Sequence, residues 1–133
     1  MPERSSMDLV IAAKGQIENL TPDDVQCEIA AGNVTLIDLR ESEELQENGK
    51  IEGSIHAPRG LLEFYADPAR PVYKPEFIKN NRLILYCSRG LRSALAVVTL
   101  QEMGYTSVAH LEGGFEGWKD GGKPIVEERN LCP

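Results

Sequence analysis

The sequence predicts an α/β fold in which a five-stranded, mostly parallel sheet carries helices on both faces. Two observations support this prediction. Short runs of branched apolar residues alternate with helical segments along the 133 residues. The strongest strand is Arg82-Leu-Ile-Leu-Tyr86, and the run Val34-Thr-Leu-Ile-Asp38 is typical of a buried parallel strand. The length and the 41% hydrophobic share suit one domain, which we expect to span residues 1–133.

The first half of the chain contains clear start and stop signals. The expected elements are, in order, an N-terminal helix or arm at 1–16, a short strand at 17–20, a helix at 22–31, a strand at 34–38, a polar helix at 41–48 and a short strand at 53–58. Thr21 followed by Pro22 is a favourable helix start, and Gly32 is a favourable stop. The strand at 34–38 is rich in β-branched residues, and Gly49 ends the helix that follows it.

The second half begins with an insertion rich in proline and aromatic residues at 64–81, which prolines keep irregular. The elements expected after it are a strand at 82–86, an apolar and therefore buried helix at 91–103, a strand at 107–111 and a short helix that opens at Gly113-Gly114 and carries Phe115 and Trp118. The insertion either forms one wall of an active site or is a satellite cluster that pins a loop. We favour the satellite cluster.

The charge pattern restricts the partners. The net charge of −7 argues against nucleic-acid and anionic membrane partners. No apolar run reaches the length of a membrane helix and no signal-like stretch follows the N-terminus, so we expect a cytoplasmic protein. Residues 83–101 contain no acidic residue but include Arg89 and Arg92. This locally cationic segment predicts a small anionic substrate.

The cysteine and histidine content argues against a disulfide framework and a metal site. The three cysteines, Cys27, Cys87 and Cys132, have no paired spacing, and no CxxC or Cys/His cluster occurs. We expect no metal and no cofactor. His56 and His110 each lie at the end of an apolar run and are interpreted as strand-end residues.

The loop after the strand at 82–86 is the candidate active site, because ligands of parallel sheets bind at the carboxyl ends of strands. Cys87 is the first residue of this loop and the expected nucleophile. Backbone N–H groups, the dipole of the next helix and two arginines are expected to lower the pKa of its thiol. The expected substrate-binding residues are Ser88, Arg89, Gly90, Leu91, Arg92 and Ser93. The alternative is a buried strand-end cysteine beside ordinary surface charges.

Three landmarks give the chain a resemblance to the single-domain rhodaneses, from about Leu20 onward. The first landmark is Leu36-Ile-Asp38-Leu-Arg40 followed by Glu44, and then Gly49-Lys-Ile-Glu-Gly-Ser-Ile55 and Pro58. The second is Cys87-x-x-Gly90-x-Arg92-Ser93. The third is Leu111-x-Gly113-Gly114-Phe115-x-x-Trp118. Many members have His where this chain has Lys50, a departure from which we infer no loss of chemistry. Asp38 and Arg40 are expected to be structural, with Arg40 and Glu44 as a charge pair.

The resemblance implies a five-stranded parallel sheet and a sulfurtransferase that works through a persulfide on Cys87. Cys87 would take the outer sulfur of thiosulfate or a related small anionic donor. The acceptor would be cyanide in assays and a thiol or a protein in cells. Cys132 is expected to be a bystander thiol near the C-terminus.

Other functions use a similar loop. Phosphatases and arsenate reductases on related folds place the arginine six positions after the cysteine, whereas Arg92 is five positions after Cys87. No acid lies in the loop to protonate a leaving alcohol. A non-catalytic regulatory module is a second alternative, although such modules typically lack the cysteine. A relay that passes the persulfide to a partner protein is a third.

Overall fold

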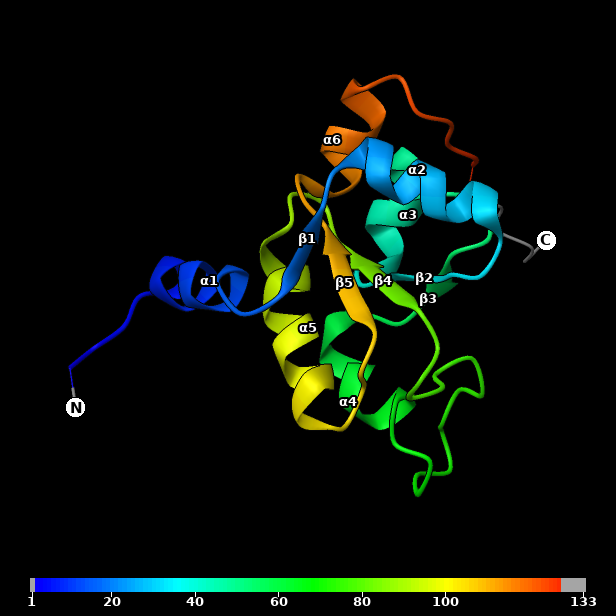
Figure 1. The fold of residues 1–133 in the computed structure, drawn as a ribbon. Helices are drawn as coiled ribbons and strands as arrows, with labels where there is room; N and C mark the ends of the chain where they lie inside the picture. Colours follow the sequence, from blue (N-terminus) through cyan, green and yellow to red (C-terminus); the bar gives the residue numbers. More distant parts are fainter. Residues whose placement is uncertain (1, 128–133) are drawn as a thin grey trace.

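The computed structural model describes residues 2–127, which fold around a five-stranded sheet in the order β1-β5-β4-β2-β3 (Figure 1). The strands are β1 (Glu18–Leu20), β2 (Thr35–Asp38), β3 (Ile55–His56), β4 (Leu83–Tyr86) and β5 (Val108–Leu111). All four strand pairings are parallel, so the predicted fold class is confirmed. An isolated antiparallel bridge joins Lys50 to Val126 outside these strands.

The helices follow the predicted alternation. They are α1 (Ser6–Lys14), α2 (Pro22–Ala31), α3 (Ser42–Asn48), α4 (Leu62–Tyr65), α5 (Leu91–Glu102) and α6 (Gly114–Asp120), with a 3₁₀ turn η1 (Arg59–Leu61). Thr21 caps α2 as predicted, since its hydroxyl accepts from the backbone N–H of Asp24. None of the helices within residues 2–127 is both long and apolar enough to cross a bilayer.

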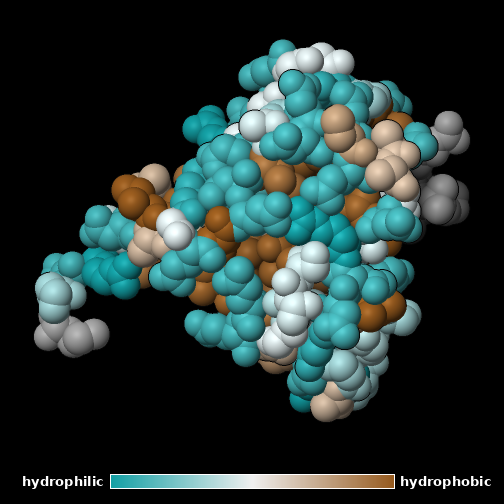
Figure 2. All heavy atoms as spheres, viewed as in Figure 1, coloured by the Kyte–Doolittle hydropathy of each residue, from teal (hydrophilic) through white to brown (hydrophobic). Residues whose placement is uncertain are grey.

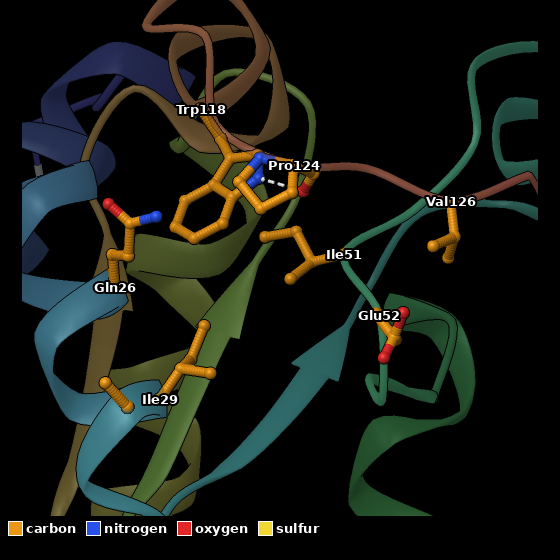
Figure 3. A pocket seen from close by; sticks show the side chains of 8 residues that line it. Gln26, Ile29, Ile51, Glu52, Trp118, Pro124 and Val126 are labelled. Atoms are coloured by element: carbon orange, nitrogen blue, oxygen red, sulfur yellow. Dashed lines mark hydrogen bonds between the residues drawn. The ribbon is translucent and has the colours of Figure 1, made fainter.

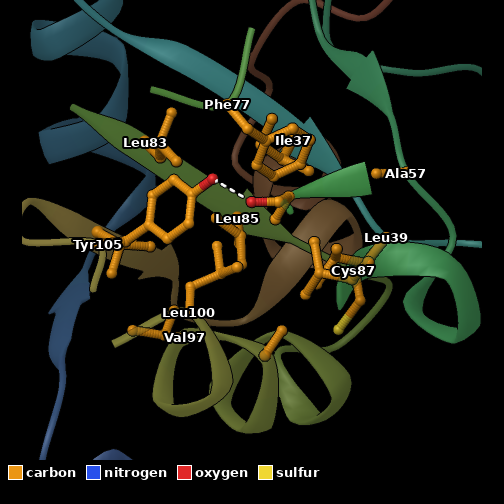
Figure 4. Close-up of a cluster of buried hydrophobic side chains, with 14 residues drawn as sticks. Ile37, Leu39, Ala57, Phe77, Leu83, Leu85, Cys87, Val97, Leu100 and Tyr105 are labelled. Atoms are coloured by element: carbon orange, nitrogen blue, oxygen red, sulfur yellow. Dashed lines mark hydrogen bonds between the residues drawn. The ribbon is translucent and has the colours of Figure 1, made fainter. Parts of the chain in front are cut away.

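Two hydrophobic layers cover the sheet. On one face, Leu83 and Leu85 of β4 pack with Val97 and Leu100 of α5 (Figure 4). The other face packs against α2 and α6, with Trp118 fully buried. The alternation of side chains along β4 sends neighbouring residues to opposite layers, which explains why the predicted run is apolar throughout.

Helix α1 packs outside α5, through a small cluster that includes Val10 and Ala13 of α1 and Ala94 of α5. Its other side carries three exposed hydrophobic residues, Met7, Leu9 and Ile11. Hydrophobic surface is visible on this projecting helix in Figure 2, while most of the rest of that face is hydrophilic.

The insertion at 64–81 packs onto the main core, because Ala66 and Phe77 are buried in the same layer as β4 and α5 rather than in a separate satellite cluster. Phe77 is buried and makes an edge-to-face contact with Tyr105, with ring centroids 6.3 Å apart. The Tyr105 hydroxyl donates to the backbone oxygen of Ala66 at 2.7 Å (Figure 4). In Figure 1 this segment lies at the end of the sheet opposite α3 and α6. It therefore forms no wall of the loop at Cys87.

Asp38 and Arg40 form an ion pair inside the protein, where both side chains are almost completely excluded from solvent. Two guanidinium nitrogens of Arg40 donate to the Asp38 carboxylate, at 3.1 and 2.8 Å. The guanidinium also donates to the Gly49 backbone oxygen and lies over the Phe115 ring, 4.1 Å from its centroid. Arg40 therefore has a structural role, but the expected pair between Arg40 and Glu44 is wrong.

Candidate active site

The loop at Cys87 connects the carboxyl end of β4 to the first turn of α5. Cys87 is only 1% exposed, and its sulfur lies beside α5 (Figure 4). The backbone N–H of Gly90 donates to the Cys87 Sγ atom at 3.2 Å, and the Ser93 hydroxyl lies 3.6 Å from the same sulfur. A left-handed Gly90, with φ of 89°, allows this tight return of the chain.

Helix α6 holds the loop from outside. The N–H of Phe115 donates to the Cys87 backbone oxygen at 2.8 Å, and the N–H of Glu116 donates to the Ser88 backbone oxygen at 3.0 Å. Because a trans peptide directs its C=O and N–H to opposite sides, the N–H groups of Ser88 and Arg89 point away from α6. The clamp thus leaves the backbone donors of the loop available to an anion bound at Cys87.

Gly114 of α6 packs tightly against the backbone of the loop. It adopts φ of 62°, and a Cβ at this position would lie 2.6 Å from the Cys87 carbonyl oxygen and from the Ser88 carbonyl carbon. The backbone of the loop leaves no room for a side chain here, which explains the second glycine of the Gly113-Gly114 pair.

We expect Gly114→Ala to displace the loop and to lower the free energy of unfolding by about 2 kcal/mol or more. Gly122→Ala is the matched control, because Gly122 also has a positive φ, of 75°, but a Cβ added there would meet no atom within 4 Å. Urea unfolding of both variants measures the difference. Equal losses of stability in the two variants would contradict the proposed close contact.

Arg92 is paired with a carboxylate that the sequence analysis assigned to another partner. Its guanidinium makes two hydrogen bonds of 2.9 Å to Glu44, which also accepts from the Ser88 hydroxyl at 2.8 Å. The hydrogen bonds from Arg92 are the main cause that lowers the pKa of Glu44 to about 2, so Glu44 is ionised at neutral pH. The loop sequence contains no acid, but Glu44 of α3 places a carboxylate beside the loop.

Arg89 is also paired, since its Nε atom lies 2.9 Å from the Glu116 carboxylate in a largely exposed contact. The segment that is cationic in the sequence is thus balanced by two carboxylates from α3 and α6. An open pocket of about 350 Å³ lies beside the loop. Loop residues and both carboxylates line it: Glu44, Cys87, Ser88, Arg89, Leu91, Arg92 and Glu116.

The structure brings the predicted site residues together around one sulfur atom. Ser88, Arg89, Leu91 and Arg92 line the pocket with Cys87, whereas Gly90 and Ser93 contact the sulfur itself. The sequence analysis missed three neighbours. Glu44 was noted but was paired wrongly, Glu116 carried no signal, and His110 was interpreted only as a strand-end residue although its Nδ1 atom lies 2.9 Å from the Ser93 hydroxyl.

The other cysteines lie elsewhere. Cys27 is exposed on α2, and Cys132 lies outside the described residues. No group of three or more side chains suited to hold a metal occurs within residues 2–127.

A second cavity lies between α2, α6 and the chain after α6, away from the Cys87 loop (Figure 3). Its lining is mostly apolar: Gln26, Ile29, Ala30, Ile51, Glu52, Trp118, Pro124 and Val126. Trp118 donates its indole N–H to the Pro124 backbone oxygen at 2.8 Å, which fixes the ring at the rim. These lining residues include no cysteine.

Comparisons with known proteins find sulfurtransferases among the relatives of this chain. A sulfurtransferase of Allochromatium vinosum is 32% identical over 94 residues, which cover 71% of this chain and 79% of the relative. Thiosulfate sulfurtransferase GlpE of Actinobacillus succinogenes is 26% identical over 114 residues, covering 86% of this chain and 95% of the relative.

A solved structure from Rhodopseudomonas palustris, of a protein of unknown function described as a possible tyrosine phosphatase, is also similar. It matches with a TM-score of 0.87 and 42% identity, covering 95% of this chain and 99% of the other. The model of the rhodanese-like domain family matches residues 21–121, which include the loop and the α6 clamp. This chain therefore belongs to the rhodanese-like domain family.

Proposed function

We propose that this protein is a sulfurtransferase that carries a sulfane sulfur as a persulfide on Cys87. The observation that carries the proposal is the contact of the Cys87 sulfur with a backbone N–H of its own loop, at the carboxyl edge of a parallel sheet. The sulfurtransferases among the relatives support the same chemistry. The donor is thiosulfate or a related small anion, and the acceptor is cyanide in assays and a thiol or a partner protein in cells.

The reaction has two displacements. The Cys87 thiolate attacks the outer sulfur of thiosulfate, so a new S–S bond forms on Cys87 while the S–S bond of thiosulfate breaks and sulfite leaves with the electron pair. A nucleophilic acceptor then attacks the terminal sulfur of the persulfide, and the Cys87 thiolate is regenerated. Cyanide leaves as thiocyanate.

The loop supplies what this intermediate needs. The terminal sulfur of a persulfide is anionic, and the N–H groups of residues 88–90 are suited to stabilise it without a mobile cation. The proposed substrate-binding residues remain those of the loop from Ser88 to Ser93. Arg92 and Arg89 bring positive charge to the pocket, and each is balanced by a carboxylate. Such a pocket suits a small anion that is held by backbone donors as well as by the two arginines.

We expect Glu44→Gln to lower the KM for thiosulfate by about two- to fivefold, because the ionised carboxylate competes with the donor for Arg92. The amide keeps an oxygen for the Ser88 hydroxyl, so the geometry of the loop is retained. Glu116→Gln is the control, since its pair with Arg89 is mostly exposed and screened. Steady-state kinetics with thiosulfate measure both variants, and a higher KM in Glu44→Gln would oppose this view of the pocket.

A phosphatase or arsenate reductase is the second candidate, favoured by the description of the Rhodopseudomonas palustris neighbour. The short spacing from Cys87 to Arg92 makes a small cradle for a tetrahedral oxyanion. The pocket carboxylate nearest the sulfur loop, Glu44, is held ionised by Arg92, so it is not a proton donor to a leaving alcohol at neutral pH. Both features favour sulfur transfer.

The test is a side-by-side assay of the purified protein. We expect thiocyanate to form from thiosulfate and cyanide, with no hydrolysis of an aryl phosphate and no reduction of arsenate in the presence of a thiol. Phosphate release without thiocyanate would replace the proposal with the phosphatase. If none of the three assays gives activity although Cys87 alkylates normally, a binding module or a relay that receives sulfur from a partner protein would be favoured.

A further inference from the structure

A continuous line of hydrogen-bonding groups leads from the Cys87 sulfur through the protein. The Ser93 hydroxyl lies 3.6 Å from the sulfur and 2.9 Å from Nδ1 of His110. On the other side of the ring, Nε2 of His110 lies 2.8 Å from Oδ1 of Asn19. These residues come from α5, β5 and β1, so the line depends on the parallel pairing of β1 with β5.

The direction of each hydrogen bond in this line follows from Asn19. The side-chain nitrogen of Asn19 donates to the backbone oxygens of Lys14 and Ile17, at 3.0 and 3.2 Å. Its Oδ1 atom is therefore the acceptor, and Nε2 of His110 must carry the proton. Nδ1 of a neutral His110 is then an acceptor that takes the hydrogen of the Ser93 hydroxyl, whose oxygen is left to accept from the Cys87 thiol.

The surroundings of His110 keep this acceptor available. The ring is completely buried, and burial is the main cause that lowers the pKa of His110. Two charged groups face it: the Glu112 carboxylate lies 3.3 Å from Nε2, and Lys14 of α1 is paired with that carboxylate at 2.6 Å. The imidazole is thus neutral at rest, with a carboxylate placed where a positive charge on the ring would develop.

We propose that His110 receives the proton of the Cys87 thiol through Ser93, so that the nucleophile forms as a thiolate–imidazolium pair. In this step the S–H proton passes to the Ser93 oxygen, and the original Ser93 hydroxyl proton passes to Nδ1 of His110. The two hydrogen bonds among Cys87, Ser93 and His110 then reverse, so that Ser93 donates to the new thiolate, while Nε2 of His110 continues to donate to Asn19. The low exposure of Cys87, 1%, explains the need for an internal acceptor. His110 acts through Ser93 and is a positioning residue.

The test follows both partners of the proton transfer in the same sample. A Cys27→Ser, Cys132→Ser variant leaves Cys87 as the single thiol, because the sequence has three cysteines. The ultraviolet absorbance of the thiolate and the ¹⁵N NMR shifts of His110 are recorded against pH. Comparison with His56→Gln assigns the resonances, since the sequence has two histidines.

We expect the thiolate that is present near neutral pH, below the ionisation of the thiol to solvent, to be matched by an equal fraction of His110 that carries a proton on Nδ1. A Cys87→Ser variant should lose this fraction of imidazolium. Thiolate beside a fully neutral His110, or no thiolate in this pH range, would overturn the proposal, because the thiol proton would then have gone to solvent or stayed on the sulfur.

Asn19→Asp provides a second readout. A carboxylate at this position accepts from Nε2 and stabilises the imidazolium, so the pH midpoint of thiolate formation should fall by about half a unit. Asn80→Asp is the matched control, since it makes the same change at an exposed site where Asn80 accepts from the Thr106 hydroxyl, outside this line of hydrogen bonds. An unchanged or raised midpoint in Asn19→Asp would contradict the relay.

The inference rests on Cys87 being the nucleophile of the proposed sulfur transfer, yet its readouts need no sulfur donor. If no sulfur is transferred but the contents of Cys87 thiolate and protonated His110 match, the proposed reaction is wrong and the relay stands. If sulfur is transferred normally but the two contents do not match, only the relay is wrong.

Discussion

Cys87→Ser is expected to reduce sulfur transfer from thiosulfate to cyanide by about four orders of magnitude or more. A serine hydroxyl is smaller than the thiol and fits the same space, but it forms no persulfide and is not ionised near neutral pH. The fold should persist, because the loop is held by the backbone hydrogen bonds that Phe115 and Glu116 donate. Thiocyanate formation measures the loss, and circular dichroism checks the fold.

Cys27→Ser is the matched control for this prediction. Cys27 is also a free cysteine, but it is exposed on α2 and lies outside the pocket at Cys87. The Cys27→Ser variant should retain the full rate. Retention of the rate in Cys87→Ser, or its loss in Cys27→Ser, would move the chemistry away from the loop.

Asp38→Asn is expected to lower the free energy of unfolding by about 3 to 5 kcal/mol, the largest effect on stability that we predict. The substitution removes the charge that compensates Arg40, whose side chain is 1% exposed and donates twice to Asp38. A buried cation would be left with the amide oxygen at position 38, the Gly49 oxygen and two aromatic rings, none of which carries a compensating negative charge. Urea unfolding gives the free energy directly.

Glu63→Gln serves as the control for a surface pair. Glu63 contacts Arg59 one helical turn away, and both side chains are partly exposed, at 43% and 28%. Its loss should cost less than about 0.5 kcal/mol. If Asp38→Asn were as mild as this control, the buried pair would contribute little to the fold.

The elements of the fold were predictable where local signals and apolar patterns agree. Thr21 and Pro22 mark the start of α2, and the apolar run at 82–86 contains β4. The turn η1 and helix α4 were missed, because a few residues that follow Pro58 carry no period or cap. Their position depends on the packing of Leu62 in the core, which is a tertiary contact.

The candidate site was predictable only along the chain. The residues from Cys87 to Ser93 are consecutive, so one loop contains them all. Their charge balance was not visible, because Glu44 reaches Arg92 from a helix 48 residues earlier. His110 was missed for the same reason, since β5 brings it to Ser93 only when the sheet forms. The net charge of a sequence segment therefore does not predict the net charge of the pocket that the segment lines, because residues from other elements contribute to the pocket.

The intact mass of the protein after incubation with thiosulfate tests the central claim most directly. We predict a gain of one sulfur atom, in which the added mass is removed by cyanide and is absent from Cys87→Ser. The Cys27→Ser variant should gain the same mass, which excludes modification of the exposed thiol. An unchanged mass in a protein whose Cys87 still alkylates would contradict a persulfide formed from thiosulfate.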